Sequence, residues 1–160
     1  MSYFKKFLNQ FGDKKIDIYV DMDGVVADIE MLNFEKHKND EDVYLNKRPV
    51  QSVINVLEEV SHLDNVDIYI LSVARKENQI QGKIKWLKKY MDFISLSHIN
   101  IIPREGNDFK HASELKSSFL KNNIDKEAVN ISIDDSHNVL NEVYALKLDI
   151  IPLHISSIID

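Results

Sequence analysis

Short β-branched runs alternate with longer helical patterns along this chain, and the alternation leaves few architectures open. Five apolar runs have the length of strands; they are Ile16–Val20, Val66–Leu71, His98–Ile102, Val129–Ile133 and Asp149–Ile155. Runs with so little polar alternation suit a sheet that is covered on both faces. Parallel neighbours need crossovers, which the helical patterns between the runs would supply. The sequence therefore predicts a Rossmann-like three-layer α/β/α sandwich with a mainly parallel five-stranded sheet.

Apolar residues at helical spacing between these runs are interpreted as the core faces of four helices. The stripes are Val53, Ile54, Leu57 and Val60; Ile80, Ile84, Leu87 and Met91; Ala112, Leu115 and Phe119; and Leu140, Val143 and Tyr144. Tyr3–Phe11 is expected to form an additional helix, and Trp86 to lie in the core. With no linker and no internal repeat, residues 1–160 are expected to form a single domain.

The composition disfavours several functional classes. There is no cysteine, which removes disulfides, thiolate metal sites and cysteine nucleophiles. The formal net charge of −6 disfavours a general nucleic-acid binder, because a phosphate backbone attracts a basic surface. No apolar run approaches the ~18 residues of a membrane span. No signal-peptide core follows the first residues, so we expect a cytoplasmic protein with no membrane partner.

Polar side chains gather where the expected strands end, with carboxylates after the first and fourth strands and a hydroxyl after the second. In chain order they are Asp21, Asp23, Ser72, Asp134 and Asp135. Ligands of an open parallel sheet bind beyond the carboxyl ends of its strands, so these groups are expected to share one edge. Carboxylates this close repel one another unless a cation lies among them. Mg²⁺ completed by a phosphate fits such oxygen ligands best, whereas a lone Asp-x-Asp would be explained by capping alone.

In this order the residues resemble the haloacid dehalogenase-like (HAD) superfamily of phosphatases. The first motif, residues 21–28 (DMDGVVAD), is similar to that of the 5'(3')-deoxyribonucleotidases. Residues 70–72 (ILS), 82–87 (GKIKWL) and 131–135 (ISIDD) correspond to later motifs of that family. The resemblance covers roughly residues 16 to 155 and implies a HAD-like fold.

The resemblance also implies a role for each motif residue. Asp21 would be the nucleophile that forms an aspartyl-phosphate. Asp23 would protonate the leaving oxygen and then deprotonate the attacking water. Ser72 would hydrogen-bond the phosphoryl oxygens. The implied Mg²⁺ ligands are Asp21, the backbone carbonyl of Asp23, Asp135 and, in support, Asp134.

The family further requires a lysine beside the nucleophile, and two residues compete for that role. Lys110 lies directly before the helical pattern at 112–119, and Lys116 lies inside it. Lys110 is preferred, because the start of a helix points at the site better than its middle. An ordinary surface lysine would explain either residue.

Two features depart from the nucleotidases. Only residues 29–48 precede the helix that follows the first motif, so the family's cap is expected to be minimal or absent. A cap excludes water from the site and contacts the leaving group, which selects the substrate. The second motif continues Val73-Ala74-Arg75 where the nucleotidases have Thr-Ser-Pro. Arg75 suits a phosphate contact, although a solvated loop is the preferred interpretation.

The leading hypothesis is a Mg²⁺-dependent phosphomonoesterase whose small-molecule substrate is a nucleoside monophosphate. One alternative is a phosphatase for a nucleic-acid end, a phosphoprotein or a sugar phosphate, and another is a non-catalytic phosphate-binding relative. Nucleic acid is otherwise not expected as a partner. An oligomer in which a second subunit supplies the lid is also compatible with the sequence. A signalling receiver domain is disfavoured because the third run ends at Pro103 without an aspartate.

Overall fold

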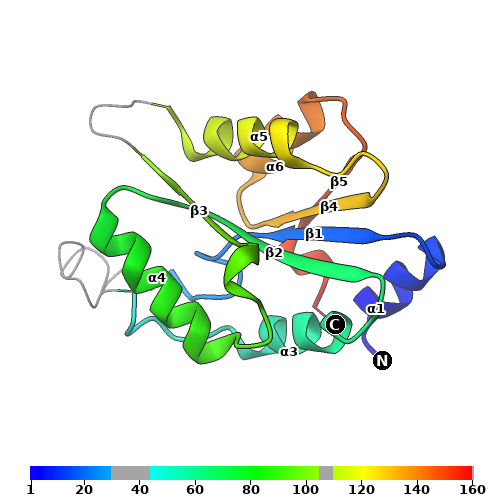
Figure 1. The fold of residues 1–160 in the computed structure, drawn as a ribbon, viewed down its shortest axis with the longest axis horizontal. Helices are drawn as coiled ribbons and strands as arrows, with labels where there is room; N and C mark the ends of the chain where they lie inside the picture. Colours follow the sequence, from blue (N-terminus) through cyan, green and yellow to red (C-terminus); the bar gives the residue numbers. More distant parts are fainter. Residues whose placement is uncertain (30–43, 105–109, 160) are drawn as a thin grey trace.

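The computed structural model describes residues 1–29, 44–104 and 110–159. Its five strands form one sheet in the order β3-β2-β1-β4-β5, and every neighbouring pair is parallel. The strands are β1 Ile16–Val20, β2 Val66–Ala74, β3 Ile99–Pro103, β4 Val129–Asp134 and β5 Ile150–His154 (Figure 1). The predicted fold is thereby confirmed.

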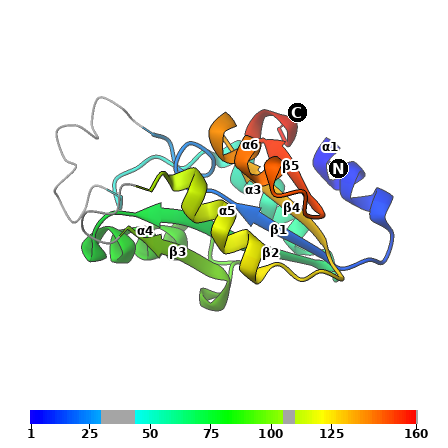
Figure 2. The ribbon, with the colours of Figure 1, turned by 90° about the horizontal axis from the view of Figure 1, so that it is seen from above.

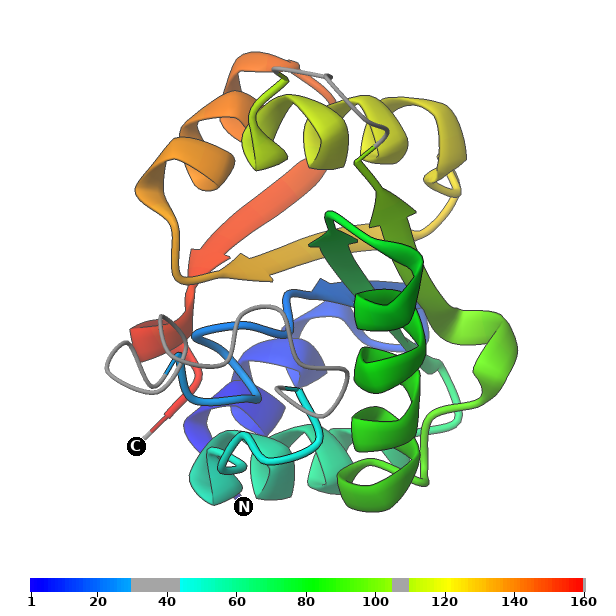
Figure 3. The same cartoon turned by 90° about the vertical axis from the view of Figure 1, so that its left-hand side faces the viewer.

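Helices cover both faces of this sheet. They are α1 Tyr3–Leu8, α3 Gln51–Ser61, α4 Glu77–Tyr90, α5 Ala112–Asn123 and α6 His137–Ala145. Figure 3 looks at the carboxyl ends of the strands, with α5 and α6 over one face and α3 and α4 across the other. In Figure 2, α1 lies at the opposite end, beside the amino ends of the strands. None of the described helices is both long enough and apolar enough to cross a membrane.

The core has two parts because successive side chains of a strand point to opposite faces. On β1, Ile16, Ile18 and Val20 belong to the larger cluster, which also holds Trp86 of α4. Tyr19 faces the smaller cluster beneath α5 and α6. All five residues of β1 are buried, as the apolar run predicted. The central strand is thus fixed on both faces, and whatever follows it emerges at a defined place.

The register of β1 with its neighbours decides where the first motif begins. Val20 pairs with Ile70 of β2 and with Ile133 of β4. The next residue, Asp21, donates its backbone N–H to the Ile133 carbonyl at 2.9 Å. Asp21 is therefore level with the end of β4 and with the part of β2 that carries Ser72.

The expected helix faces are only partly confirmed. The four stripe residues of α3 are all buried. On α4 and α5 the buried faces instead include the polar side chains Gln79, Lys83 and Lys116. On α6, Tyr144 is 76% exposed because it lies one position round the helix from the buried Val143. Apolar periodicity missed the polar positions because these helices lie against a polar edge of the sheet.

The remaining boundaries differ in small ways. The expected helix at 3–11 is α1 followed by a 3₁₀ turn, η1 Asn9–Phe11. Strand β2 runs to Ala74, so Ser72 lies inside it and not after it. Two further 3₁₀ turns are η3 Leu96–His98 and η4 Ile155–Ser157. Most of the expected cap, at 30–43, lies outside the described residues.

Two residues that the sequence placed in helix stripes should respond differently to truncation. Leu57 has no exposed surface, so Leu57→Ala should reduce the free energy of unfolding by about 2–5 kcal/mol. Tyr144→Ala is the matched control and should change it by no more than about 0.5 kcal/mol. Urea unfolding monitored by circular dichroism measures both. An equally large loss for Tyr144→Ala would contradict its exposed position.

Candidate functional site

Three carboxylates meet at the carboxyl ends of β1 and β4. Asp21, Asp134 and Asp135 each offer an oxygen, and these atoms lie within 4.8 Å of one another. Asp21 is 8% exposed and Asp134 only 2%, so water screens their charges poorly. An oxygen-only set of this kind suits a hard divalent cation such as Mg²⁺.

A tight turn after β1 lets Asp135 approach the first motif. Gly24 has φ +83°, and a Cβ built on it would collide with the Asp135 carboxylate. The turn is closed by the Met22 carbonyl, which accepts from the N–H groups of Val26 at 3.0 Å and Ala27 at 2.9 Å. Glycine is required here both for the left-handed backbone and for the space that Asp135 occupies.

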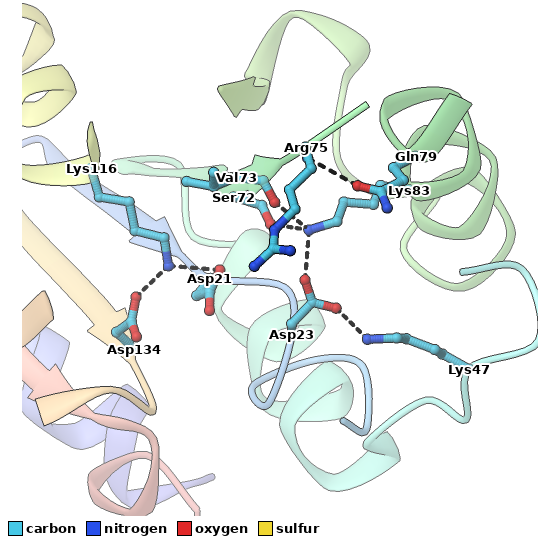
Figure 4. A network of polar contacts seen from close by, with 10 residues as sticks. All are labelled: Asp21, Asp23, Lys47, Ser72, Val73, Arg75, Gln79, Lys83, Lys116 and Asp134. Atoms are coloured by element: carbon cyan, nitrogen blue, oxygen red, sulfur yellow. Dashed lines mark hydrogen bonds and ion pairs between the residues drawn. The ribbon is translucent and has the colours of Figure 1, made fainter. Parts of the chain in front are cut away.

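Lys116 neutralises part of this cluster. Its Nζ lies 2.8 Å from Asp21 Oδ1 and 2.6 Å from Asp134 Oδ2, as Figure 4 shows. Lys116 is itself 5% exposed. The other Asp134 oxygen accepts the backbone N–H of Ser136 at 2.9 Å. The ammonium group therefore holds β1 and β4 together at the point where their carboxylates would repel.

Burial and mutual repulsion shift the pKa values of the ionisable groups in this cluster. Burial raises the pKa of Asp21 to about 6, with Lys116 opposing the rise and Asp134 adding to it. The pKa of Asp135 is also raised, by burial and by the charge of Asp21. Burial alone would lower the pKa of Lys116, but Asp21 and Asp134 outweigh it and the pKa is raised. Carboxylates that are costly to ionise together are the kind that a cation stabilises, so the residues fit a Mg²⁺ site.

Asp23 has a separate set of partners. Lys83 Nζ lies 2.5 Å from its Oδ2, and Lys47 Nζ lies 2.5 Å from its Oδ1. Burial alone would raise the pKa of Asp23, but the two lysines lower it below its ordinary value. Within the first motif, Asp21 thus lies in the carboxylate cluster and Asp23 lies against two lysines (Figure 4).

Ser72 lies on the same side as Asp23. Its hydroxyl accepts a hydrogen bond from Lys83 Nζ at 2.7 Å, and the residue is 1% exposed. Arg75 follows β2, and its backbone N–H donates to Gln79 Oε1 at 2.9 Å. In Figure 4 the Arg75 side chain points toward the space between Asp21 and Asp23. An anion in that space would face the Ser72 hydroxyl and the Lys116 ammonium group, with the exposed Arg75 beside it.

The structure brings Lys116 to Asp21, whereas the sequence analysis preferred Lys110. Lys110 is exposed and directly precedes α5, and its carbonyl accepts from Arg104 Nη2 at 2.6 Å. Helical side chains point back toward the N-terminus, so a long side chain just after the first turn reaches past the helix start. Lys116 is therefore the lysine that contacts Asp21, and the assignment of either lysine to the family's role stays a prediction.

Sequence reasoning gave Lys47 and Lys83 no role. Lys83 lay within the GKIKWL motif, and the signal that could have identified it is its spacing from Gln79 and Trp86, which share its buried face. Lys47 lay within the expected cap insertion, and no local pattern in the sequence marks it as buried.

A cavity of about 520 Å³ opens beside the carboxylates, between the first turns of α5 and α6. Besides Asp21, Lys116, Asp134 and Asp135 it is lined by His111, Ala112, Ser113, Glu114, Ser136, Asn138, Val139, Asn141 and Glu142. Among the described residues of this lining, Lys116 is the one lysine or arginine.

Comparison with known proteins identifies relatives of this chain. The family model for the polynucleotide kinase PNKP phosphatase domain matches residues 16–154. Among solved structures, a chain of the Pnkp1/Rnl/Hen1 RNA repair complex superposes with a TM-score of 0.65 at 17% identity, over 89% of this chain and 43% of that one. A class C acid phosphatase from Bacillus anthracis, with tungstate bound, gives a TM-score of 0.55 at 17% identity.

These neighbours are longer than this chain. The match to the acid phosphatase covers 89% of this chain and 64% of that one, so in neither neighbour does the chain cover two thirds of the length. At such low identity the superpositions show a shared fold. Comparison with the curated proteins gives no match.

The carboxylate cluster should respond to Mg²⁺ in a way that a stability measurement detects. Mg²⁺ at a hundredfold excess over its Kd should raise the Tm of the wild type by about 5 °C, because the cation binds only the folded cluster. Asp135→Asn removes one charge, so this variant should be more stable than the wild type without Mg²⁺ and should respond less to it. Asp149→Asn, an exposed aspartate outside the cluster, is the control. Equal Tm shifts in all three proteins would rule out this site.

Proposed function

We propose that this chain, which belongs to the polynucleotide kinase PNKP phosphatase-domain family, is a Mg²⁺-dependent phosphomonoesterase that works through an aspartyl-phosphate on Asp21. That it is a HAD-family phosphatase domain follows from the match over residues 16–154. The finer proposal is carried by one observation, the contact of the buried Asp21 with Lys116 in a cluster with two further carboxylates. A buried carboxylate so placed is a nucleophile with a cation beside it.

In the first step a carboxylate oxygen of Asp21 attacks the phosphorus atom of the ester. The bond to the leaving oxygen breaks with its electron pair, and that oxygen takes a proton from Asp23. A phosphoryl dianion in the space between Asp21 and Asp23 would favour the protonated form of Asp23, against the effect of its two lysines. Ser72 donates its hydroxyl hydrogen to a phosphoryl oxygen in this arrangement.

In the second step water attacks the phosphorus atom and gives its proton to Asp23. The bond between phosphorus and Asp21 breaks, which restores both aspartates and releases phosphate. Lys47 and Lys83 favour the ionised form of Asp23, which is the form that accepts this proton. Lys116, and not Lys110, takes the role of the lysine beside the nucleophile in this proposal.

The residues that would hold Mg²⁺ are Asp21, Asp134 and Asp135, together with the backbone carbonyl of Asp23. When bound, the ion would offset the negative charge on the phosphoryl oxygens, the main requirement of phosphoryl transfer. Lys116 supplies a fixed positive charge on the neighbouring side of Asp21.

The substrate we favour is the terminal phosphate of a nucleic-acid strand. The support is the matched family, a polynucleotide kinase's phosphatase domain, and the RNA repair complex among its structural neighbours. A nucleoside monophosphate is the second candidate, supported by the similarity of residues 21–28 to the deoxyribonucleotidases. The net charge of −6 also favours a short ligand over an extended strand.

A phosphate-release assay tests the reaction and ranks these substrates. The panel contains p-nitrophenyl phosphate, 3'- and 5'-nucleoside monophosphates, and oligonucleotides phosphorylated at either end. Wild-type release should require Mg²⁺ and stop with EDTA, and Asp21→Asn should lose at least about 10³-fold because the nucleophile is gone. Undiminished activity in Asp21→Asn would refute the aspartyl-phosphate. Faster release from the nucleoside monophosphates than from either oligonucleotide would replace the favoured substrate with the second candidate.

Arg75 provides a test of how a strand is bound. Since its side chain points toward the site, it would contact the phosphodiester next to the terminal phosphate. Arg75→Ala should raise KM for a phosphorylated oligonucleotide about tenfold, the value of one charge-assisted contact, and leave KM for p-nitrophenyl phosphate within about twofold. Arg48→Ala, at an exposed arginine that contacts Asp28, is the control. A rise of equal size for both esters would show that Arg75 binds the reacting phosphate instead.

A further inference from the structure

Both oxygens of the Asp23 carboxylate are held by lysines, one from α4 and one from the segment before α3. We propose that Lys47 and Lys83 are positioning residues, which fix the Asp23 carboxylate where it can exchange a proton with the leaving oxygen. This inference rests on the proposed phosphatase function. It adds to that function a means of hydrolysing esters whose leaving groups are poor.

Lys83 is fixed in every direction. Its side chain has no exposed surface. The ammonium group has three N–H donors, and three acceptors surround it: Asp23 Oδ2 at 2.5 Å, Ser72 Oγ at 2.7 Å and the Val73 carbonyl at 2.9 Å. Strand β2 supplies two of these acceptors and the first motif the third. Lys83 therefore sets the distance between Asp23 and the strand that carries Ser72.

Lys47 is fixed through its backbone as well as its side chain. It is 5% exposed, and its Nζ lies 2.5 Å from Asp23 Oδ1. Its carbonyl accepts the indole N–H of Trp86 at 2.9 Å. Trp86 is wholly buried on α4, the helix that also carries Lys83. Helix α4 therefore positions both lysines, and they contact the Asp23 carboxylate through its two different oxygens.

Tyr44 covers the two ammonium groups. It is 5% exposed, and its ring centroid lies 5.1 Å from Lys47 Nζ and 5.1 Å from Lys83 Nζ. An aromatic face attracts a cation, and here it also shields the lysines from water. The ion pairs of Asp23 are thus stronger and less mobile than pairs at an open surface.

Burying two lysines against one aspartate has a free-energy cost, which argues that the arrangement serves a function. Each buried ammonium group loses its hydration, and a single lysine would already neutralise Asp23. The second lysine removes the freedom of the carboxylate to rotate about its side chain. Lys116 contacts Asp21 and Asp134. Asp23 is therefore held apart from the carboxylate cluster by lysines of its own.

Position matters most where a proton must move. The p-nitrophenolate ion is a weak base and leaves without protonation, whereas the alkoxide of a sugar hydroxyl needs a proton from Asp23. Loosening Asp23 should therefore slow the hydrolysis of a sugar phosphate ester and spare p-nitrophenyl phosphate. A general loosening of the fold would slow both esters alike.

The experiment compares Lys47→Met and Lys83→Met with the wild type on p-nitrophenyl phosphate and on the nucleotide or oligonucleotide that the wild type hydrolyses fastest. For the sugar ester, kcat should fall about 30-fold, less than the roughly 10²–10⁴-fold that a general acid contributes in full, and by less than about threefold for p-nitrophenyl phosphate. For Lys47→Met, KM for both esters and inhibition by inorganic phosphate should stay unchanged. Lys83→Met also removes the hydrogen bond to Ser72 Oγ and should weaken inhibition by phosphate. Lys85→Met, at an exposed lysine of the same helix, is the matched control and should behave as the wild type.

A double-mutant cycle gives the second readout. If the lysines act through Asp23, adding either substitution to Asp23→Asn should reduce kcat no further. Equal losses on the two esters, or additive losses with Asp23→Asn, would overturn the inference and leave the phosphatase function intact. A wild type that hydrolyses no ester would overturn both. Should Lys83→Met fail to fold, Lys47→Met, in which Lys83 still pairs with Asp23, decides the question.

Discussion

Repulsion among carboxylates at one edge of the sheet is the constraint that organises this structure. Asp21, Asp134 and Asp135 lie within 4.8 Å of one another, in a place where water screens little. Lys116 crosses from α5 to Asp21 and Asp134 and makes their approach tolerable. Pairing with carboxylates likewise accounts for the buried lysines of α4 and α5, which share their helix faces with both polar and apolar residues. Both electrostatic pairing and apolar burial therefore act on the inward faces of these helices.

The chain divides its first motif between two environments. Asp21 meets other carboxylates, and its pKa is raised to about 6, whereas the pKa of Asp23 is lowered by its two lysines although burial opposes them. The two roles proposed for these aspartates, nucleophile and proton carrier, would make use of this difference. Gly24 makes the division possible, because its backbone turns where an ordinary residue would strike Asp135.

Local sequence patterns predicted the strands and the carboxylates at the ends of β1 and β4, whereas Ser72 lies inside β2. Strand β1 has the predicted bounds, and the others differ by one to three residues at an end. The positions of Lys47, Lys83 and Lys116 could not be predicted in this way. A lysine in a helix reads as solvated by default, and only the assembled fold shows that its ammonium group reaches a carboxylate. Tyr144 fails in the opposite sense, since an aromatic residue in an apolar stripe was expected to be buried.

The central place of β1 also determines when the site can come into being. β1 is an early strand in the chain, yet its partners β2 and β4 begin at Val66 and Val129. A polypeptide emerging from the ribosome would hold Asp21 without Lys116 or Asp134 until most of the domain had been synthesised. Contacts so distant in sequence also make folding slow. Asp21, the proposed nucleophile, is among the first parts of the site to be translated, and its surroundings are completed last.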